Sequence, residues 1–224
     1  MRRVINPRTA ADPELLTGFG ALLERYSPSC MVSDVMERAR TMHSAIELRV
    51  GERFVGSALT VRLAPGDLVD CLDALPVADA GDVIVVDAAG ETETSIWGGL
   101  MAGLCRMKGV VGAVVDGGIR DIDEIADVGF SIASRSVVPR STHSPYSGRM
   151  EPIEINVPIT CGGCLVEPGD VVLVDEIGAV AVPRAEAADV LRRAEELAER
   201  EEATRRMIRA GRTVDELLAE FGRL

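Results

Sequence analysis

The chain has 224 residues, of which 47% are hydrophobic and 27% are charged, and its mean hydropathy is +0.16. This composition can fill one sizeable core, and no uncharged apolar run of about 18 residues is present that would span a membrane. The net charge of −12, without a basic stripe, repels phosphate backbones, so we expect neither a nucleic acid nor a membrane as partner.

The chain is expected to form a single domain over residues 1–224, because no low-complexity segment or internal repeat interrupts it. Within it we expect N-terminal helices over 12–40, an α/β core over 54–183 and a helical arm over 185–224. The sequence from Met1 lacks the basic and then apolar pattern of a secretory signal, so the expected compartment is the cytoplasm.

Helical spacing of apolar residues opens the chain, over Pro13–Tyr26 and again over Ser29–Arg40. Pro28–Ser29 is the expected cap of the second helix. Phe54–Leu63 is typical of a strand, and a Pro-Gly turn separates it from renewed helical spacing over Leu68–Ala78.

A stronger alternation of strands and helices follows. Asp82–Asp87 predicts a strand buried on both faces, Gly98–Gly109 a helix of small residues, and Val110–Val115 a second buried strand. Two strands joined through a helix are typical of a parallel βαβ core, so the predicted fold class is α/β. A short helix over Asp121–Asp127 precedes a strand-rich portion. Strands are expected there over Phe130–Ala133, Ile153–Val157, Cys164–Val166, Val171–Asp175 and Ala179–Val182.

The last segment is predicted to be a charged amphipathic arm. Its helix over Ala185–Ala210 has a narrow apolar seam, and Glu and Arg occupy the other faces at mutually supporting spacing. A short helix over Val214–Phe221 follows it. Because so narrow a seam adds little to the chain's own core, we expect the arm to make contacts between subunits.

Cysteines and histidines are not assigned any chemistry. An odd number of cysteines favours reduced, mostly buried thiols at Cys30, Cys71, Cys105, Cys161 and Cys164. The last two have the spacing of a redox or half-zinc motif, but neither a second pair nor a following helix supports that interpretation. His43 and His143 match no metal-ligand spacing and are expected at the surface or in loops.

The segment from Trp97 to Asp121 concentrates the residues that could carry chemistry. It predicts a glycine turn into a helix, then a buried strand, then a second glycine turn. Loops at the carboxyl ends of neighbouring parallel strands gather at one crevice, so the turns after Asp87 and Val115 are expected to lie side by side.

Two kinds of binding group meet in this segment. Gly98 and Gly99 begin a helix whose free amides suit a carboxylate or phosphate, although glycine is also an ordinary helix start. Asp116 and Asp121 offer oxygen ligands beside Arg120, whose guanidinium can grip a carboxylate through two hydrogen bonds. Together these groups predict metal-assisted chemistry on a small oxo acid.

Further motifs along the chain match one family pattern. They are Ser33–Asp34, Gly56–Arg62, Pro65–Asp67, Gly81–Asp87, Gly117–Asp121, Pro139–Thr142 and Gly169–Asp175 through Val182–Pro183. In these motifs, over residues 30–200, the chain resembles the RraA-like proteins, which include class II 4-hydroxy-4-methyl-2-oxoglutarate and 4-carboxy-4-hydroxy-2-oxoadipate aldolases. The resemblance implies an α/β/β/α fold of the swivelling type.

The resemblance also implies a divalent Mg²⁺ or Mn²⁺ ion held by Asp121 and waters, with Arg120 contacting the pyruvyl group of the substrate. The implied reaction releases a pyruvate enolate, by retro-aldol cleavage or by decarboxylation of oxaloacetate. The substrate carboxylate would be bound by amides at the helix start, at Gly98, Gly99, Leu100 and Met101.

One position departs from the family. Its aldolases carry an acidic residue, which orients a water for proton transfer, where this chain has Gly99, and glycine has no side chain for that role. Glu91, Glu93 and Asp116 are candidate replacements, or else solvated loop acids and structural turn residues. Decarboxylation removes no hydroxyl proton, so it should survive this change better than aldol cleavage.

The family completes its site with a glutamate from the C-terminal helix of a neighbouring subunit, which agrees with the predicted arm. Glu199 and Glu202 are the candidates, or else they are solvated helix acids. The implied assembly is a homotrimer, with pairing into a hexamer left open. A loop flanked by Arg135, Arg140 and Arg149 either closes over the crevice or is a plain exposed loop.

Functions from two other classes compete with the lyase. The family's namesake, a regulator of ribonuclease activity, binds and inhibits a ribonuclease, and a net charge of −12 allows binding to a basic protein. Arg120 and Asp121 favour the enzyme, whereas Gly99 weakens that case. Methyl transfer from S-adenosylmethionine would need a nucleotide-binding glycine loop, which Asp87–Gly90 matches poorly.

Overall fold

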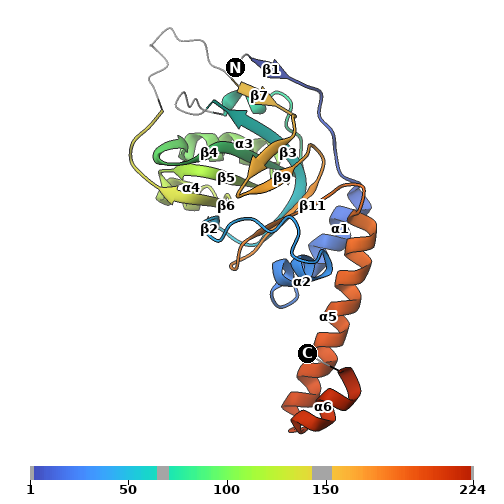
Figure 1. Cartoon of the computed structure of the whole chain (residues 1–224). Coiled ribbons are helices and arrows are strands. Elements are labelled where there is room, and N and C mark those ends of the chain that lie inside the picture. The colour runs from blue at the N-terminus through green and yellow to red at the C-terminus, as the bar shows by residue number, and fades with distance from the viewer. Residues whose placement is uncertain (1–2, 65–70, 143–152, 223–224) are drawn as a thin grey trace.

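The computed structural model describes residues 3–64, 71–142 and 153–222. At its centre is a mixed sheet of strand order β1-β7-β3-β4-β5-β6-β2, and β10, paired with β11, joins it through β3 (Figure 1). The strands are β1 (Val4–Ile5), β2 (Glu47–Val50), β3 (Phe54–Leu63), β4 (Asp82–Trp97), β5 (Gly112–Ile119), β6 (Ile132–Val137), β7 (Ile153–Ile155), β8 (Ile159–Cys161), β9 (Cys164–Val166), β10 (Val171–Val174) and β11 (Ala179–Val182). The helices are α1 (Pro13–Leu22), α2 (Pro28–Val35), α3 (Gly99–Lys108), α4 (Ile122–Asp127), α5 (Ala187–Arg209) and α6 (Val214–Phe221), with a 3-10 turn η1 (Leu72–Ala74).

The middle of the sheet is the predicted parallel core. Strands β3, β4, β5 and β6 run parallel, with α3 between β4 and β5 and α4 between β5 and β6. Strands β7 and β10 pair antiparallel with β3, and β2 pairs antiparallel with β6. The strand-rich part of the chain after α4 therefore extends and covers a parallel core, as the sequence indicated.

Side chains of the central strands alternate between two cores. Ile84 and Val86 of β4 pack in a cluster with residues of α3 and α4. Val83 and Val85 pack on the opposite face, against the β8–β9 hairpin and the β10–β11 pair. The outer face of β10 and β11 packs in turn on α1, α2 and α5. These layers give the α/β/β/α order that the family resemblance implied.

The second helix is shorter than the periodicity predicted. It ends at Val35, because Glu37, Arg38 and Arg40 adopt positive φ angles that no helix contains. Ser29 lies inside the helix and is not its cap. Its amide and hydroxyl donate to the buried carboxylate of Asp175, at 2.9 and 2.8 Å.

Two further expectations about local structure were wrong, and three short strands were missed. The described part of Leu68–Ala78 is the 3-10 turn η1 followed by a turn, not an α-helix, while residues 65–70 lie outside the described ranges. Strand β4 continues ten residues past Asp87, to Trp97. The short strands β1, β2 and β8 carry too few residues for an alternation signal, and the sequence analysis missed them.

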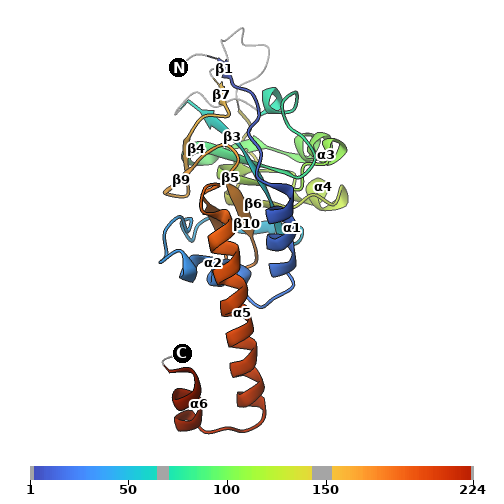
Figure 2. The same ribbon diagram turned by 90° about the vertical axis from the view of Figure 1, so that its right-hand side faces the viewer.

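The C-terminal arm is confirmed as a long helix with a narrow apolar seam. Helix α5 packs on α1 and α2 over its first half, then extends beyond the rest of the chain, and α6 folds back beside its far end (Figure 2). Thr213 and Glu216 form a capping box that fixes the start of α6. None of the described helices combines the length and the apolar character needed to cross a bilayer.

Cysteines occupy the expected environments. Cys30 is exposed, and Cys71, Cys105, Cys161 and Cys164 are buried. Burial raises the pKa of the Cys105 thiol to about 12. Cys161 and Cys164 face each other across the β8–β9 hairpin, whose turn is formed by two glycines with positive φ. His43 is exposed in a loop, as expected, and His143 lies outside the described residues.

Asp175 should dominate the stability of the contact between α2 and the β10–β11 turn. Its fully buried carboxylate accepts four hydrogen bonds, from the Ser29 amide and hydroxyl and from the amides of Ile177 and Gly178. We expect Asp175→Ala to lower the free energy of unfolding by roughly 3 kcal/mol, because buried donors lose a charged acceptor.

The neighbouring residue supplies the control for urea unfolding. Glu176 forms an exposed ion pair with Arg53, so Glu176→Ala should cost less than about 1 kcal/mol. Equal losses for the two variants would show that Asp175 does not anchor α2.

Candidate active site

The parallel pairing of β4 and β5 brings the two halves of the Trp97–Asp121 segment together. Asp87 is opposite Asp116, and after three register shifts Trp97 is opposite Ile119. The amide of Arg120 then donates to the carbonyl of Trp97 at 2.9 Å. The predicted convergence is therefore confirmed, but it occurs at the extended strand ends, not directly after Asp87 and Val115.

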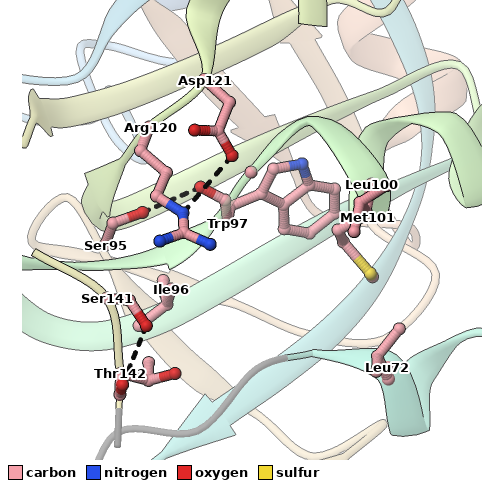
Figure 3. A pocket seen from close by; sticks show the side chains of 11 residues that line it. Leu72, Ser95, Ile96, Trp97, Leu100, Met101, Arg120, Asp121, Ser141 and Thr142 are labelled. Carbon is pink, nitrogen blue, oxygen red and sulfur yellow. Dashed lines mark hydrogen bonds and ion pairs between the residues drawn. The ribbon is translucent and has the colours of Figure 1, made fainter. Parts of the chain in front are cut away.

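A pocket of 370 Å³ opens at these strand ends. Ile96, Trp97, Met101 and Leu72 form apolar walls, and Trp97 stacks on Phe130 with ring centroids 6.1 Å apart. Its polar lining comes from β4, from the two residues that follow β5 and from a segment that follows β6. These polar residues are Arg120, Asp121, Ser95, Ser141 and Thr142 (Figure 3). A pocket of this size, apolar with a few polar groups, is typical of a small-molecule site.

Asp121 adopts a backbone conformation that turns its side chain toward the pocket. Its φ and ψ angles are 54° and 43°, in the left-handed region that a non-glycine residue occupies at a cost in free energy. Although Asp121 precedes the first turn of α4, its carboxylate does not cap that helix. Its Oδ2 atom instead lies 3.3 Å from Nε of Arg120 and 3.4 Å from the Gly99 amide nitrogen.

Gly98 is required by the position of Asp121. A Cβ atom on Gly98 would lie 2.5 Å from Oδ2 of Asp121, closer than unbonded atoms approach. Gly98 is the N-cap of α3. The amides of Gly99, Leu100 and Met101 therefore have no carbonyl partner within that helix, and they form its positive end beside the pocket. The expected set of backbone donors and the Arg120–Asp121 pair thus border one cavity.

The three acids named as replacements for a side chain at residue 99 do not line the pocket. Asp116 is a structural residue, because its carboxylate binds Arg135 Nε at 2.5 Å and accepts from the Gly162 amide at 2.7 Å. Glu91 accepts from the amide of Glu93 at 2.6 Å, within the bulged part of β4. Asp116 therefore lies outside the pocket lining, and its carboxylate connects Arg135 of β6 with the Gly162 amide of the β8–β9 hairpin.

Glu124 is the acid that the sequence analysis missed. A Cβ atom on Gly99 would lie 2.2 Å from Cδ and Oε2 of Glu124, so this carboxylate occupies the space of the absent side chain. Glu124 follows Asp121 by one helical turn on α4, and this spacing was its one detectable signal. Ser95, Ser141, Thr142 and Leu72 were also missed as pocket residues, because no motif marks them.

Both candidate glutamates of the arm lie on α5, outside the residues that line this chain's pocket (Figure 1). Glu199 is exposed, and no ion pair joins it to a described residue. Glu202 pairs with Arg205 at 3.6 Å and with Arg209 at 3.5 Å. Arg140 is exposed and precedes the Ser141–Thr142 wall, and Arg149 lies outside the described residues.

Comparison with known proteins identifies relatives of this chain. A family model described as Aldolase/RraA, of the RraA-like group, matches residues 29–181. A protein of Halalkalibacterium halodurans, provisionally named a 4-hydroxy-4-methyl-2-oxoglutarate aldolase, is 35% identical over 199 residues, covering 88% of this chain and 90% of the relative. A Thermus thermophilus protein named 4-hydroxy-4-methyl-2-oxoglutarate aldolase is 31% identical, covering 58% of this chain and 76% of the relative.

A solved structure has the same fold. Streptomyces coelicolor RraAS2, described as an unusual member of the RNase ES inhibitor RraA protein family, superposes with a TM-score of 0.73 at 28% sequence identity. The match covers 87% of this chain and 98% of RraAS2. The fold is therefore shared over most of the chain.

Gly98→Ala should displace the Asp121 carboxylate from its place at the start of α3, because the added Cβ overlaps Oδ2. If Asp121 is the metal ligand that the resemblance implied, Mn²⁺ affinity should fall about tenfold or more, as when a ligand's support is removed. Electron paramagnetic resonance of free Mn²⁺ would measure this.

Gly20→Ala, in the interior of α1, is the matched control, since nothing lies within 4 Å of its added Cβ. That variant should retain Mn²⁺ affinity and gain about 0.5–1 kcal/mol of stability from helix propensity. If Gly98→Ala binds Mn²⁺ as tightly as wild type, metal binding does not depend on the position of the Asp121 carboxylate.

Proposed function

The chain belongs to the RraA-like family, and on this premise we propose that it is a divalent-metal-dependent lyase that cleaves carbon–carbon bonds in pyruvyl-containing oxo acids. Substrates of the 4-hydroxy-4-methyl-2-oxoglutarate type would undergo retro-aldol cleavage, and oxaloacetate would lose carbon dioxide. The observation that carries the proposal is the placement of Arg120 and Asp121 at one pocket wall, beside the free amides at the start of α3.

Asp121 fits a metal site with one protein carboxylate. Its side chain is 40% exposed, and no hydrogen bond from the described residues reaches its Oδ1 atom. Among the described residues no group of three or more His, Cys, Asp and Glu side chains could hold a metal. Waters, substrate and a residue of another subunit would complete the coordination, as is usual for Mg²⁺. When bound, the ion supplies Lewis-acid stabilisation of negative charge on the pyruvyl group.

Arg120 is suited to hold the substrate. Its Nε atom faces Asp121, and its two terminal nitrogens make no hydrogen bond to a described residue, so they are available to a carboxylate. The amides of Leu100 and Met101 present further donors to the same pocket. Trp97 and Leu72 restrict water on the apolar side, which strengthens these charged interactions.

We extend the proposal to a homotrimer, with pairing of two trimers into a hexamer left open. Leu100, Leu104 and Met107 lie along one face of α3 and are exposed, Leu100 at 79% and Met107 at 84%. Leu100 also lines the pocket, so a second copy on this face would close the pocket from outside. Glu199 is then the favoured glutamate to enter from a neighbour, because Glu202 is engaged by two arginines.

The second candidate function is that of a non-catalytic regulator that binds a ribonuclease. The favouring observation is the structural match to RraAS2, a member of an RNase inhibitor family. A net charge of −12 would support binding to a basic partner. Fold alone does not separate an enzyme from a binding protein on the same scaffold, so turnover has to be measured.

Asp121→Ala tests the lyase. Wild type should release pyruvate from 4-hydroxy-4-methyl-2-oxoglutarate and from oxaloacetate with Mg²⁺ or Mn²⁺, and not with a chelator. The variant should lose on the order of 10³-fold in kcat/KM, because several kcal/mol of charge stabilisation are lost. A coupled assay of pyruvate release measures both.

Asp127→Ala is the control for Asp121→Ala. It removes an exposed carboxylate from the end of α4, the helix that follows Asp121, and should keep full activity. Wild-type turnover no faster than free metal ions on both substrates would refute these two activities. Inhibition of a ribonuclease by the same preparation would then identify the regulator.

Met107→Glu tests the assembly, because a charge in a buried apolar interface is costly. The variant should run as a monomer in sedimentation velocity, whereas Ile177→Glu, at an exposed residue of the β10–β11 turn, should not change the assembly. A trimer that persists with Met107→Glu would place the subunit interface elsewhere.

A further inference from the structure

The proposed aldol cleavage needs a proton acceptor besides the groups already assigned. The carbon that carries the substrate hydroxyl is one of the two atoms of the bond that breaks, and this hydroxyl must lose its proton as the bond opens. Among the described residues that line the pocket, Asp121 is the one carboxylate, and it is assigned to the metal. Ser95, Ser141 and Thr142 carry neutral hydroxyls, which are poor bases near neutral pH.

A second carboxylate, that of Glu124, lies against Gly99 at the start of α3, next to the residues that line the pocket but not among them. Gly99 is flanked by two acids, with Asp121 Oδ2 at 3.4 Å from its amide and Glu124 Oε2 at 2.2 Å from the position of a Cβ. Any side chain at residue 99 would expel Glu124 from this place. The glycine is therefore complementary to the glutamate, and it lets the carboxylate reach the first turn of α3.

The surroundings leave this carboxylate free to react. No hydrogen bond or ion pair joins the Glu124 side chain to another described residue. Asp116, in contrast, is bound by Arg135 and by a backbone amide, and it is 5% exposed.

We propose that Glu124 is the general base of aldol cleavage, an inference that rests on the lyase function proposed above. The Glu124 carboxylate accepts the proton of the C4 hydroxyl of 4-hydroxy-4-methyl-2-oxoglutarate. The C3–C4 bond breaks, its electron pair forms the enolate of pyruvate, and C4 becomes the carbonyl carbon of the second product. Glu124 then returns the proton to C3, so one substrate gives two pyruvates without any oxidant or reductant.

Oxaloacetate provides a built-in comparison. It has no hydroxyl proton to remove, because its bond breaks with release of carbon dioxide and leaves the same enolate. Water can protonate that enolate. Glu124 is thus needed for one reaction and dispensable for the other, whereas Arg120 and Asp121 serve both.

The first experiment compares Glu124→Gln with Asp123→Asn, an exposed acid on the same helix that does not contact Gly99. Glu124→Gln should lower kcat for aldol cleavage by about 100-fold or more, with KM and oxaloacetate decarboxylation unchanged. Asp123→Asn should leave both reactions unchanged. Equal loss of the two reactions in Glu124→Gln, or no loss, would overturn the assignment.

A second measurement needs no substrate or metal. Gly99→Asp places a side chain in the space of Glu124, so it should lower the melting temperature. The same change in a Glu124→Ala background should cost less, because the space is then empty. Equal losses in the two backgrounds would show that Glu124 does not occupy this place and would overturn the proposal.

The outcomes separate this inference from the lyase proposal. A wild-type chain without turnover on either substrate would refute both. A wild-type chain that cleaves both substrates, with Glu124→Gln equal to it, would refute the role of Glu124 alone.

Discussion

The parallel pairing of β4 with β5 is the constraint on which the candidate site depends. Both strands continue past the buried core, and register shifts after Asp87 let Trp97 end opposite Ile119. Since α3 starts at the end of one strand and α4 just beyond the end of the other, the two helix starts are brought side by side. The pocket, the Arg120–Asp121 pair and the free amides all follow from this one register.

Crowding at the two helix starts explains why glycines stand beside the acids. Asp121 adopts a left-handed conformation, so its carboxylate points at α3 and does not cap α4. Gly98 leaves room for that carboxylate, and Gly99 leaves room for Glu124. The strained backbone of Asp121 is maintained by the burial of Ile119 and Ile125 on either side, which fixes the end of β5 and the first turns of α4.

The arm and the exposed face of α3 are the two features on which the proposed assembly rests. Ala194 and Ala198 hold α5 on the chain with a narrow seam, and the far end of the helix stands clear of the sheet (Figure 2). The apolar face of α3 borders the pocket and is left exposed by the residues that the structure describes. A second copy would give the far end of α5 a packing partner and would bury the apolar face of α3, which is the physical basis of the trimer proposed above.

The sequence by itself determined the α/β class, the parallel core and the amphipathic arm, because these depend on hydrophobic periodicity. It also named Arg120 and Asp121, which both line the pocket. The strands β3, β9 and β11 and the helix α6 were predicted with their observed bounds. Tertiary structure alone decided which acid lies beside Gly99 at the start of α3. Asp116 is drawn away by Arg135 of β6, and Glu124 is placed by contact between α4 and Gly99, and neither contact is encoded in a local pattern. The long bulged continuation of β4 likewise depends on pairing with β5, so periodicity within β4 could not reveal it.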